Sequence, residues 1–590
     1  MPLHFPSFQE LGDKLARAVA RFPLAVFWAI AGTVLALMLI DSANNHEDQK
    51  IGRYLLACSL GLPLSVGLAV FSEKNALPAG QKWALQLLAL PVLAFAWWAI
   101  DPGNDFRQMH NLVWYFGLSF LFHLFVSFAA FLKKGDSVLD FWEFNKQLFI
   151  NFLAAGIYSS VIFGGLAIAI VASNELFHLH LEGKIYARLF AVVAGLFQTM
   201  YFLSNFPKDF EFDHAEIRFD SLVKNLVKWI LIPIVGLYFL ILYTYSGDIL
   251  AKRSLPIGWA SSLVVGFSVA GIFTWLMNFM LPRFDGSGII LWFKKWFWPI
   301  LTPMLVLLFV AVGRRISDYG LTEDRYLIAH LGAWLGLMAA YFILSKKDDI
   351  RIIPISLAIF TIIYLLPGIG GMDEGIRAQT QILTRLMEKN GLLKDGKAVP
   401  QKEVFKGDNA GRMNSIVLYL VQRDALAPVA NWLGKTDTDF KIKTEPYQVQ
   451  NKISSELGIS EAYNNRVSAE FRHYHRQHSN ALSALSVSGY DSLFLAQIPR
   501  GSNIPQHGFL LDEDGHTAVF DGKKTDLQPV LDGLWGNADD AEPYLDSLDH
   551  LDFSGNSSRC RLLLDEIPLK MSDDGVKLES VSGWLLVKKN

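Results

Sequence analysis

The residues before Gly368 form a succession of apolar segments, and this pattern limits the fold more than any other feature. A helix needs about 20 predominantly apolar residues to cross ~30 Å of hydrocarbon. Eleven segments approach or reach that length. They are Phe22–Ile40, Tyr54–Phe71, Trp83–Ile100, Leu112–Leu132, Leu148–Val171, Leu189–Leu203, Leu226–Tyr243, Ile257–Leu281, Trp298–Val312, Tyr326–Leu344 and Ile352–Leu366. The sequence therefore predicts an α-helical polytopic membrane bundle of about 11 spans.

The remaining residues are of a different kind, because no apolar run after Ile369 is long enough to cross a bilayer. The whole chain is 52% hydrophobic and only 18% charged, and the apolar excess lies before Pro367. We therefore expect a short cytoplasmic N-terminal segment at residues 1–21, a transmembrane helical bundle at residues 22–367, and a soluble α+β domain at residues 368–590.

Charge and cysteine content exclude some classes of partner. The C-terminal part has 25 Lys and Arg against 31 Asp and Glu, and it has no dense basic cluster to compete for phosphates. Nucleic acid is therefore not an expected partner. The two cysteines, Cys58 and Cys560, are too few and too far apart for a disulfide framework or a zinc knuckle.

The distribution of Lys and Arg in the loops indicates an orientation, because positive residues are retained in the cytoplasm. With the N-terminus inside, the alternate inner loops hold 18 Lys and Arg, and the outer loops hold 10. Eleven crossings then place the C-terminal domain on the far side. We expect a multi-pass protein of a bacterial inner membrane with a cytoplasmic N-terminus and a periplasmic C-terminal domain.

The C-terminal part alternates helical and strand patterns. Apolar residues at helical spacing predict helices over Glu374–Asn390 and Asn414–Leu433, although Pro428 interrupts the second. Residues Gly508–Phe520, with a DEDG turn, predict a β-hairpin. Further strands are predicted over Ser492–Ile498, Arg561–Leu564 and Trp584–Val587. A histidine-rich stretch with His473, His475 and His478 resembles a metal-binding spacing, but an exposed polar helix explains it better, and we expect no metal site.

The segment after the ninth span concentrates charges of both signs around Tyr319-Gly320. Such a cluster could hold a polar ligand at the membrane boundary. The interpretation that we favour is an interfacial ion-pair cluster that ties the ninth and tenth spans together. The candidate residues are Arg314, Arg315, Asp318, Glu323, Asp324 and Arg325.

Three polar residues within spans form a second set of candidates, namely His123, Asn151 and His330. Ionisable groups at membrane depth are costly and usually face the protein interior, so a proton relay or a ligand contact is conceivable. Hydrogen bonding between helices explains each of them as simply. No span centre contains an Asp or Glu to partner a relay, which argues against proton-coupled transport.

Four stretches carry a family resemblance. They are RFPLAVFWA at the first span, FWEFNKQLFINF at the fifth, RRISDYGLTEDRYL after the ninth, and EGIRAQTQILTRLMEKNGLL after the last. In this order the chain resembles the bacterial membrane proteins grouped as domain of unknown function 4153. The resemblance implies a bacterial inner-membrane protein, but that family supplies no activity, cofactor or site residue to carry over.

Three functions remain open. The one that we favour is a non-enzymatic anchor that presents the C-terminal domain to a partner, such as an envelope protein. The second is a transporter or channel for a small apolar or neutral solute, and the third is a membrane enzyme acting on a lipid-linked substrate. A polar cavity would favour transport, and a buried carboxylate beside a lateral lipid opening would favour lipid chemistry. No motif for a nucleophile, phosphate loop or cofactor rises above chance, and the oligomeric state stays open.

Overall fold

The structure is a computed structural model, and it describes most of the chain. The residues outside the description are 1–7, 43–44, 103–106, 134, 180, 213–220, 253–259, 346, 400–404, 406–408, 437, 442–445, 460–470, 476–489, 501–508, 513, 537–550, 557, 573–574, 579 and 590. The chain divides into two compact units. The first comprises residues 1–399 and 416–450, and the second comprises residues 400–415 and 451–590.

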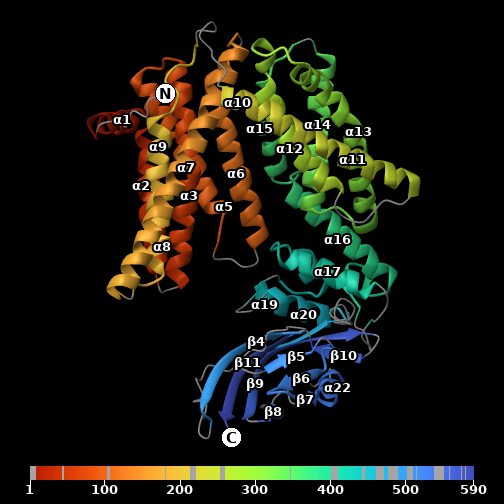
Figure 1. Cartoon of the computed structure of the whole chain (residues 1–590). Coiled ribbons are helices and arrows are strands. Elements are labelled where there is room, and N and C mark those ends of the chain that lie inside the picture. The colour runs from red at the N-terminus through yellow and green to blue at the C-terminus, as the bar shows by residue number, and fades with distance from the viewer. Residues whose placement is uncertain are drawn as a thin grey trace. The chain divides into compact units, whose positions relative to one another are not determined.

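The first unit is helical (Figure 1). Its helices as far as the last apolar segment are α1 (Phe8–Arg21), α2 (Pro23–Asp41), α3 (Asn45–Lys74), α4 (Ala79–Leu87), α5 (Ala89–Ala99), α6 (Gln108–Phe128), α7 (Val138–Phe177), α8 (Lys184–Val192), α9 (Thr199–Ser204), α10 (Ser221–Leu226), α11 (Ile232–Lys252), α12 (Ala260–Asn278), α13 (Gly288–Tyr319), α14 (Glu323–Leu344) and α15 (Ile352–Leu365). One-turn π-helical stretches, Val193–Gln198 and Val227–Leu231, join α8 to α9 and α10 to α11.

The expected fold class is confirmed, because ten of the described helical segments are long and apolar enough to cross a membrane. The chain is thus a multi-pass membrane protein. The eleventh expected span is the 14-residue helix α15, which is apolar but shorter than the ~20 residues of a full span. Several helices exceed their expected bounds. α7 has 40 residues, and the Ser137 side-chain oxygen accepts hydrogen bonds from Leu139 N and Asp140 N at its start.

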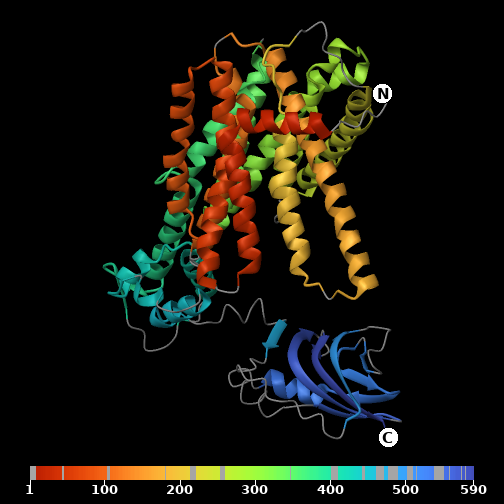
Figure 2. The ribbon, with the colours of Figure 1, turned by 90° about the vertical axis from the view of Figure 1, so that its left-hand side faces the viewer.

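Helix α1 runs across the spans rather than along them (Figure 2). Arg21, at its end, donates hydrogen bonds to Glu73 and to the backbone oxygens of Phe206 and Pro207, which fixes its place against the bundle. Helix α16 (Gly371–Lys389), which follows α15, lies at the opposite end of the bundle from α1 (Figure 1). The helical spans therefore separate these two segments.

Aromatic side chains form the core at the α1 end of the bundle. Phe144 of α7 is fully buried, and its ring lies 5.4 Å from that of Phe131 and 5.9 Å from that of Phe206. Phe206 also contacts Phe22, with ring centres 5.1 Å apart. Two of the stretches that carry the family resemblance, those around Phe22 and Phe144, thus meet through one aromatic cluster.

The first unit continues beyond the spans. It includes α16, the short hairpin of β1 (Leu393–Lys394) and β2 (Lys397–Ala398), the second half of α17 (Ala410–Val421), α18 (Ala427–Trp432) and α19 (Thr438–Lys441). α16 ends at Lys389 with Asn390 as its C-cap, and Gly391 follows with a φ of +72°, as the Asn-Gly pair predicts. The expected helix over Asn414–Leu433 is instead two helices, since Pro428 lies in the first turn of α18.

The second unit combines antiparallel sheets with short helices. Its elements are α20 (Pro446–Glu456, which begins at the end of the first unit), β3 (Phe471–His475), β4 (Ser492–Pro499), β5 (Phe509–Leu511), β6 (Thr517–Phe520), β7 (Lys523–Asp526), α22 (Gln528–Gly536), β8 (Leu551–Ser554), β9 (Ser558–Ser572), β10 (Gly575–Leu578) and β11 (Ser580–Lys589). In one sheet, strands run in the order β10-β9-β11-β4, and β3 and β8 also pair with β9. Strands β5, β6 and β7 form another sheet, so the predicted hairpin is present.

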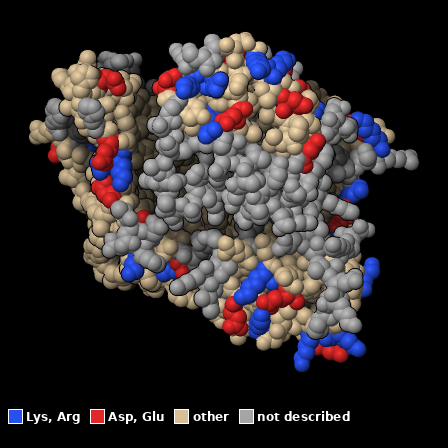
Figure 3. Space-filling view, turned by 90° about the horizontal axis from the view of Figure 1, so that it is seen from below, with Lys and Arg blue, Asp and Glu red and all other residues tan. Residues whose placement is uncertain are grey.

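The core of the second unit lies between its sheets and α22. Phe509, Leu511, Ala518 and Phe520 alternate inward from the hairpin and are buried. Burial raises the pKa of the Cys560 thiol in the same core to about 12, so this cysteine stays protonated. Figure 3 shows described Lys and Arg side chains close to Asp and Glu side chains on the face seen from below. Among the ion pairs of the second unit, Arg561 pairs with Asp552 at 2.7 Å.

One expectation for this unit is wrong. Residues Phe471–His475 form strand β3, which pairs with β9, rather than part of a polar helix. His478 lies outside the described residues. Among the described residues, no group of three or more His, Cys, Asp or Glu side chains could hold a metal ion.

Candidate functional site: a buried ion pair beside an apolar cavity

The beginning of α14 is held by segments that follow the last span. Glu323 is the first residue of α14 and is only 1% exposed. The guanidinium of Arg423 donates two hydrogen bonds to Glu323 Oε1, one of them from Nε at 3.1 Å, and the Tyr419 hydroxyl donates to Glu323 Oε2 at 2.5 Å. The Arg423 guanidinium also lies 3.6 Å from the centre of the Tyr419 ring. A buried carboxylate is thereby neutralised and fully hydrogen-bonded.

Tyr419 is suited to remain a hydrogen-bond donor in this contact. Burial and the adjacent carboxylate of Glu323 raise the pKa of Tyr419 well above its usual range. The Tyr419 hydroxyl therefore stays protonated at any physiological pH and donates a hydrogen bond to the Glu323 carboxylate.

Helix α16 packs tightly against the loop between α13 and α14. The Gln379 side-chain amide donates to the backbone oxygens of Tyr319, at 3.2 Å, and Leu321, at 2.9 Å. A Cβ atom at Gly375 would lie 3.0 Å from the backbone nitrogen of Glu323. The two remaining stretches that carry the family resemblance, after the ninth and after the last span, thus contact one another.

Gly320 packs so closely against α16 that no larger residue fits at this position. Its φ of +83 is unfavourable for other residues, and a Cβ atom there would meet Ile382 and Gln379 of α16. We expect Gly320→Ala to lower the free energy of unfolding by about 1–3 kcal/mol. Gly336→Ala is the matched control, because a Cβ atom at Gly336 meets nothing within 4 Å and should cost no stability. Unfolding in mixed micelles, followed by tryptophan fluorescence, compares the two variants; equal stabilities would contradict the tight packing.

The six charged candidates of this segment are not gathered into one cluster. Arg314 pairs with Asp318 at 3.6 Å, and about half of each side chain is exposed. Arg325 donates to the Gly320 backbone oxygen and lies over the Tyr319 ring, 5.6 Å from its centre. Arg315 lies close enough to Arg325 for the two cations to repel one another. Glu323 pairs with Arg423, which lies about 100 residues further along the chain. Asp324 lies next to a cavity between the helices.

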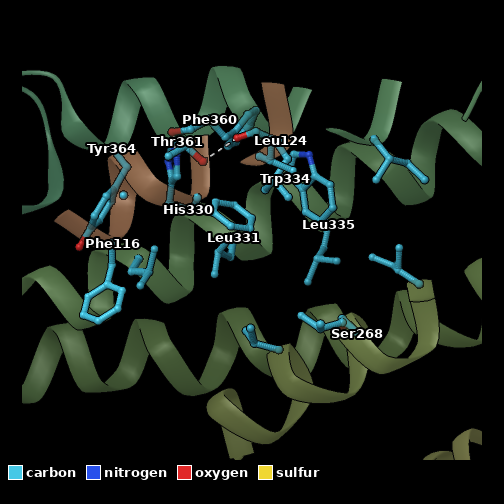
Figure 4. A pocket seen from close by; sticks show the side chains of 18 of the residues that line it. Phe116, Leu124, Ser268, His330, Leu331, Trp334, Leu335, Phe360, Thr361 and Tyr364 are labelled. Carbon is cyan, nitrogen blue, oxygen red and sulfur yellow. Dashed lines mark hydrogen bonds between the residues drawn. The ribbon is translucent and has the colours of Figure 1, made fainter. Parts of the chain in front are cut away.

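Asp324 lines a cavity of about 700 Å³ that is enclosed by α6, α12, α14 and α15. The walls are apolar side chains such as Phe116, Leu331 and Leu335 (Figure 4). The exceptions are Ser268, Asp324, His330, Thr361 and Tyr364. Two apolar lining residues, Phe116 of α6 and Val269 of α12, are 62% and 66% exposed. The cavity is therefore partly open rather than sealed inside the helical unit.

Three of the five polar side chains that line the cavity already donate hydrogen bonds to backbone oxygens. Ser268 donates to Val264 O at 2.7 Å, and Thr361 donates to Leu357 O at 2.8 Å. His330 Nε2 donates to Phe360 O of α15 at 2.8 Å, and its ring stacks on Tyr326. These three side chains offer little to a polar ligand, and His330 ties α14 to α15.

The other two intramembrane candidates lie elsewhere. Asn151 of α7 donates to the backbone oxygen of Asn205 and so links two helical segments. His123 of α6 is exposed and donates from Nδ1 to Ser119 O of its own helix at 2.7 Å. Neither lines the cavity.

The residues that sequence reasoning missed are Tyr419, Arg423, Gln379 and Gly375. Tyr419 and Arg423 are four residues apart, and the spacing indicates that they lie on one side of a helix. That signal could have suggested a shared polar contact. Nothing in the sequence identifies Glu323 as the partner, because the contact depends on how α17 folds back onto α14.

Comparison with known proteins supports the family resemblance. The family described as domain of unknown function (DUF4153) matches residues 56–381, which is more than half of the chain. An uncharacterized protein of Pasteurella multocida (strain Pm70) is 23% identical over 347 residues, and these are 58% of this chain and 55% of that relative. The match thus spans about half the length of the relative. No solved structure matches the chain. The chain belongs to the family of the domain of unknown function DUF4153.

Proposed function

We propose that this membrane protein binds a hydrocarbon chain of a membrane lipid in the cavity between α6, α12, α14 and α15. The observation that carries the proposal is the combination of a volume of about 700 Å³, almost entirely apolar walls and exposed apolar residues among those that line it. Ligand pockets of this size are typically mostly apolar, with a few polar groups that orient the ligand. Lipid chains are the apolar molecules available at the side of a membrane bundle.

The length of the cavity along α14 indicates that the lipid comes from one leaflet of the bilayer. Its lining on α14 extends from Asp324 to Leu335. At ~1.5 Å per residue, these 11 helical steps cover about 16 Å. That distance is about half of the ~30 Å hydrocarbon thickness of a bilayer. A chain inserted with its polar end beside Asp324 would therefore reach the bilayer midplane.

The other expected functions receive less support from the cavity. Transport of a small neutral solute would be served by a polar cavity, whereas these walls are apolar and three of the polar side chains are occupied. A membrane enzyme would need a carboxylate with a second reactive side chain beside it. Glu323 is held by Arg423 and Tyr419. Asp324 lines the cavity, but Ser268, His330 and Thr361 there are already hydrogen-bonded to backbone oxygens. The anchor function is compatible with lipid binding, and presentation of the second unit to an envelope partner stays a prediction.

We also propose a bacterial inner membrane as the location, with the N-terminus in the cytoplasm and the second unit on the periplasmic side. Two observations support this orientation. The predicted inner loops hold 18 Lys and Arg against 10 in the outer loops. In addition, α1 and α16 lie at opposite ends of the helical bundle. The lipid would then enter from the outer leaflet, because Asp324 lies at the α16 end of the cavity.

Blocking the cavity tests the proposed function. We expect Leu331→Trp, which inserts an indole among the lining residues, to reduce the lipid that copurifies with the full-length protein by about tenfold. Leu337→Trp is the matched control, since Leu337 lies on the same helix, is 54% exposed and does not line the cavity. Native mass spectrometry of protein released from detergent measures the bound lipid. Equal lipid retention by the two variants, with equal stability, would overturn the proposal.

A further inference from the structure

We infer that Asp324 selects the headgroup of the bound lipid, and that the lipid is an aminophospholipid with a primary ammonium group, such as phosphatidylethanolamine. This inference rests on the proposed function. It concerns the polar end of the cavity, where Asp324 and Tyr364 are the lining residues nearest the start of α14 and the end of α15.

Asp324 differs from the neighbouring acid Glu323 because its carboxylate has no hydrogen-bonded or ion-paired partner among the described residues. Glu323 is neutralised by Arg423, and the guanidinium of Arg325 is directed to the Gly320 backbone oxygen and the Tyr319 ring. Among the described residues, no hydrogen bond or ion pair engages the Asp324 side chain. The cavity therefore has one carboxylate at its polar end, and its natural complement is a cation carried by the ligand.

An ammonium group fits this carboxylate better than other headgroups do. A primary ammonium can donate charge-assisted hydrogen bonds to Asp324 while the lipid chain occupies the apolar walls. A glycerol headgroup has no positive charge, and the phosphate of an anionic lipid would be repelled.

Headgroup competition tests the inference on the full-length protein. Purified protein is mixed with equal amounts of phosphatidylethanolamine and phosphatidylglycerol that have identical acyl chains, and bound lipids are measured by native mass spectrometry. We expect wild type to prefer phosphatidylethanolamine by about tenfold. Asp324→Asn should remove the preference for phosphatidylethanolamine over phosphatidylglycerol. Asp318→Asn, which alters an acid that does not line the cavity, should behave as wild type.

A third lipid separates charge from hydrogen bonding. Phosphatidylcholine with the same chains keeps the positive charge but has no N–H donors, so it should bind wild type less well than phosphatidylethanolamine. The outcomes are distinct. If Leu331→Trp loses lipid but Asp324→Asn retains the phosphatidylethanolamine preference, the headgroup inference fails and the proposed function stands. If wild type shows no preference, the inference fails as well. If wild type retains no lipid, both fail.

Discussion

Arg423→Met is expected to lower the free energy of unfolding by about 3–5 kcal/mol, because it leaves the Glu323 carboxylate buried without its cation. The side chains of Glu323 and Arg423 are 2% and 8% exposed, so water cannot replace the lost partner. Methionine keeps most of the arginine stem, so the loss reports the charge rather than the packing. The measurement is equilibrium unfolding in mixed micelles, followed by tryptophan fluorescence.

Two further variants make this result specific. Arg377→Met is the matched control, because Arg377 also pairs with an acid, Glu374, but its side chain is 53% exposed. Its effect should stay below about 1 kcal/mol. Combining Arg423→Met with Glu323→Gln removes the uncompensated charge and should restore a large part of the lost stability. A double variant no more stable than Arg423→Met alone would show that the buried charge is not the cause.

The second large effect is expected at the other end of the bundle. Phe144→Ala should lower the free energy of unfolding by about 3–5 kcal/mol, because it empties a fully buried site. The substitution would remove the ring contacts that Phe144 makes with Phe131, Phe206 and Phe210. The same unfolding measurement serves here.

The control for this substitution lies on the same helix. Phe152 of α7 is 58% exposed, so Phe152→Ala removes the same atoms from a site that a membrane would cover. In lipid or detergent, the loss of an exposed ring leaves no cavity inside the protein, and the effect should be well below that of Phe144→Ala. Similar losses for both variants would contradict the assignment of Phe144 to the core.

Hydropathy was sufficient to predict the membrane bundle, because the length of an apolar segment is set by bilayer thickness rather than by tertiary contacts. It was less reliable at span ends. Helix α7 continues to Phe177, and α13 runs from Gly288 to Tyr319, since polar residues can extend a helix beyond the hydrocarbon. Turn residues were equally informative in the second unit, where the predicted hairpin is present as β5 and β6.

The candidate site was only partly predictable. The charged segment at residues 314–325 was identified, but local sequence suggested that its charges would pair with one another. Glu323 instead contacts Arg423, and this pairing depends on the return of α17 to the start of α14. The cavity could not be predicted either, because its walls come from four helices and its apolar wall residues look like ordinary membrane-facing side chains. The strand conformation of His473 and His475 could not be predicted from local sequence either, because strand β3 forms by pairing with β9, which is distant in the sequence.

An electron cryo-microscopy reconstruction of the full-length protein in lipid nanodiscs would test lipid binding in the cavity most directly. The nanodiscs should contain phosphatidylethanolamine and phosphatidylglycerol. We predict elongated density along α14 from Asp324 to Leu335, with its polar end beside Asp324, and no such density in Leu331→Trp. A cavity without density in wild type, or one closed by contact of α6 with α12, would contradict the account.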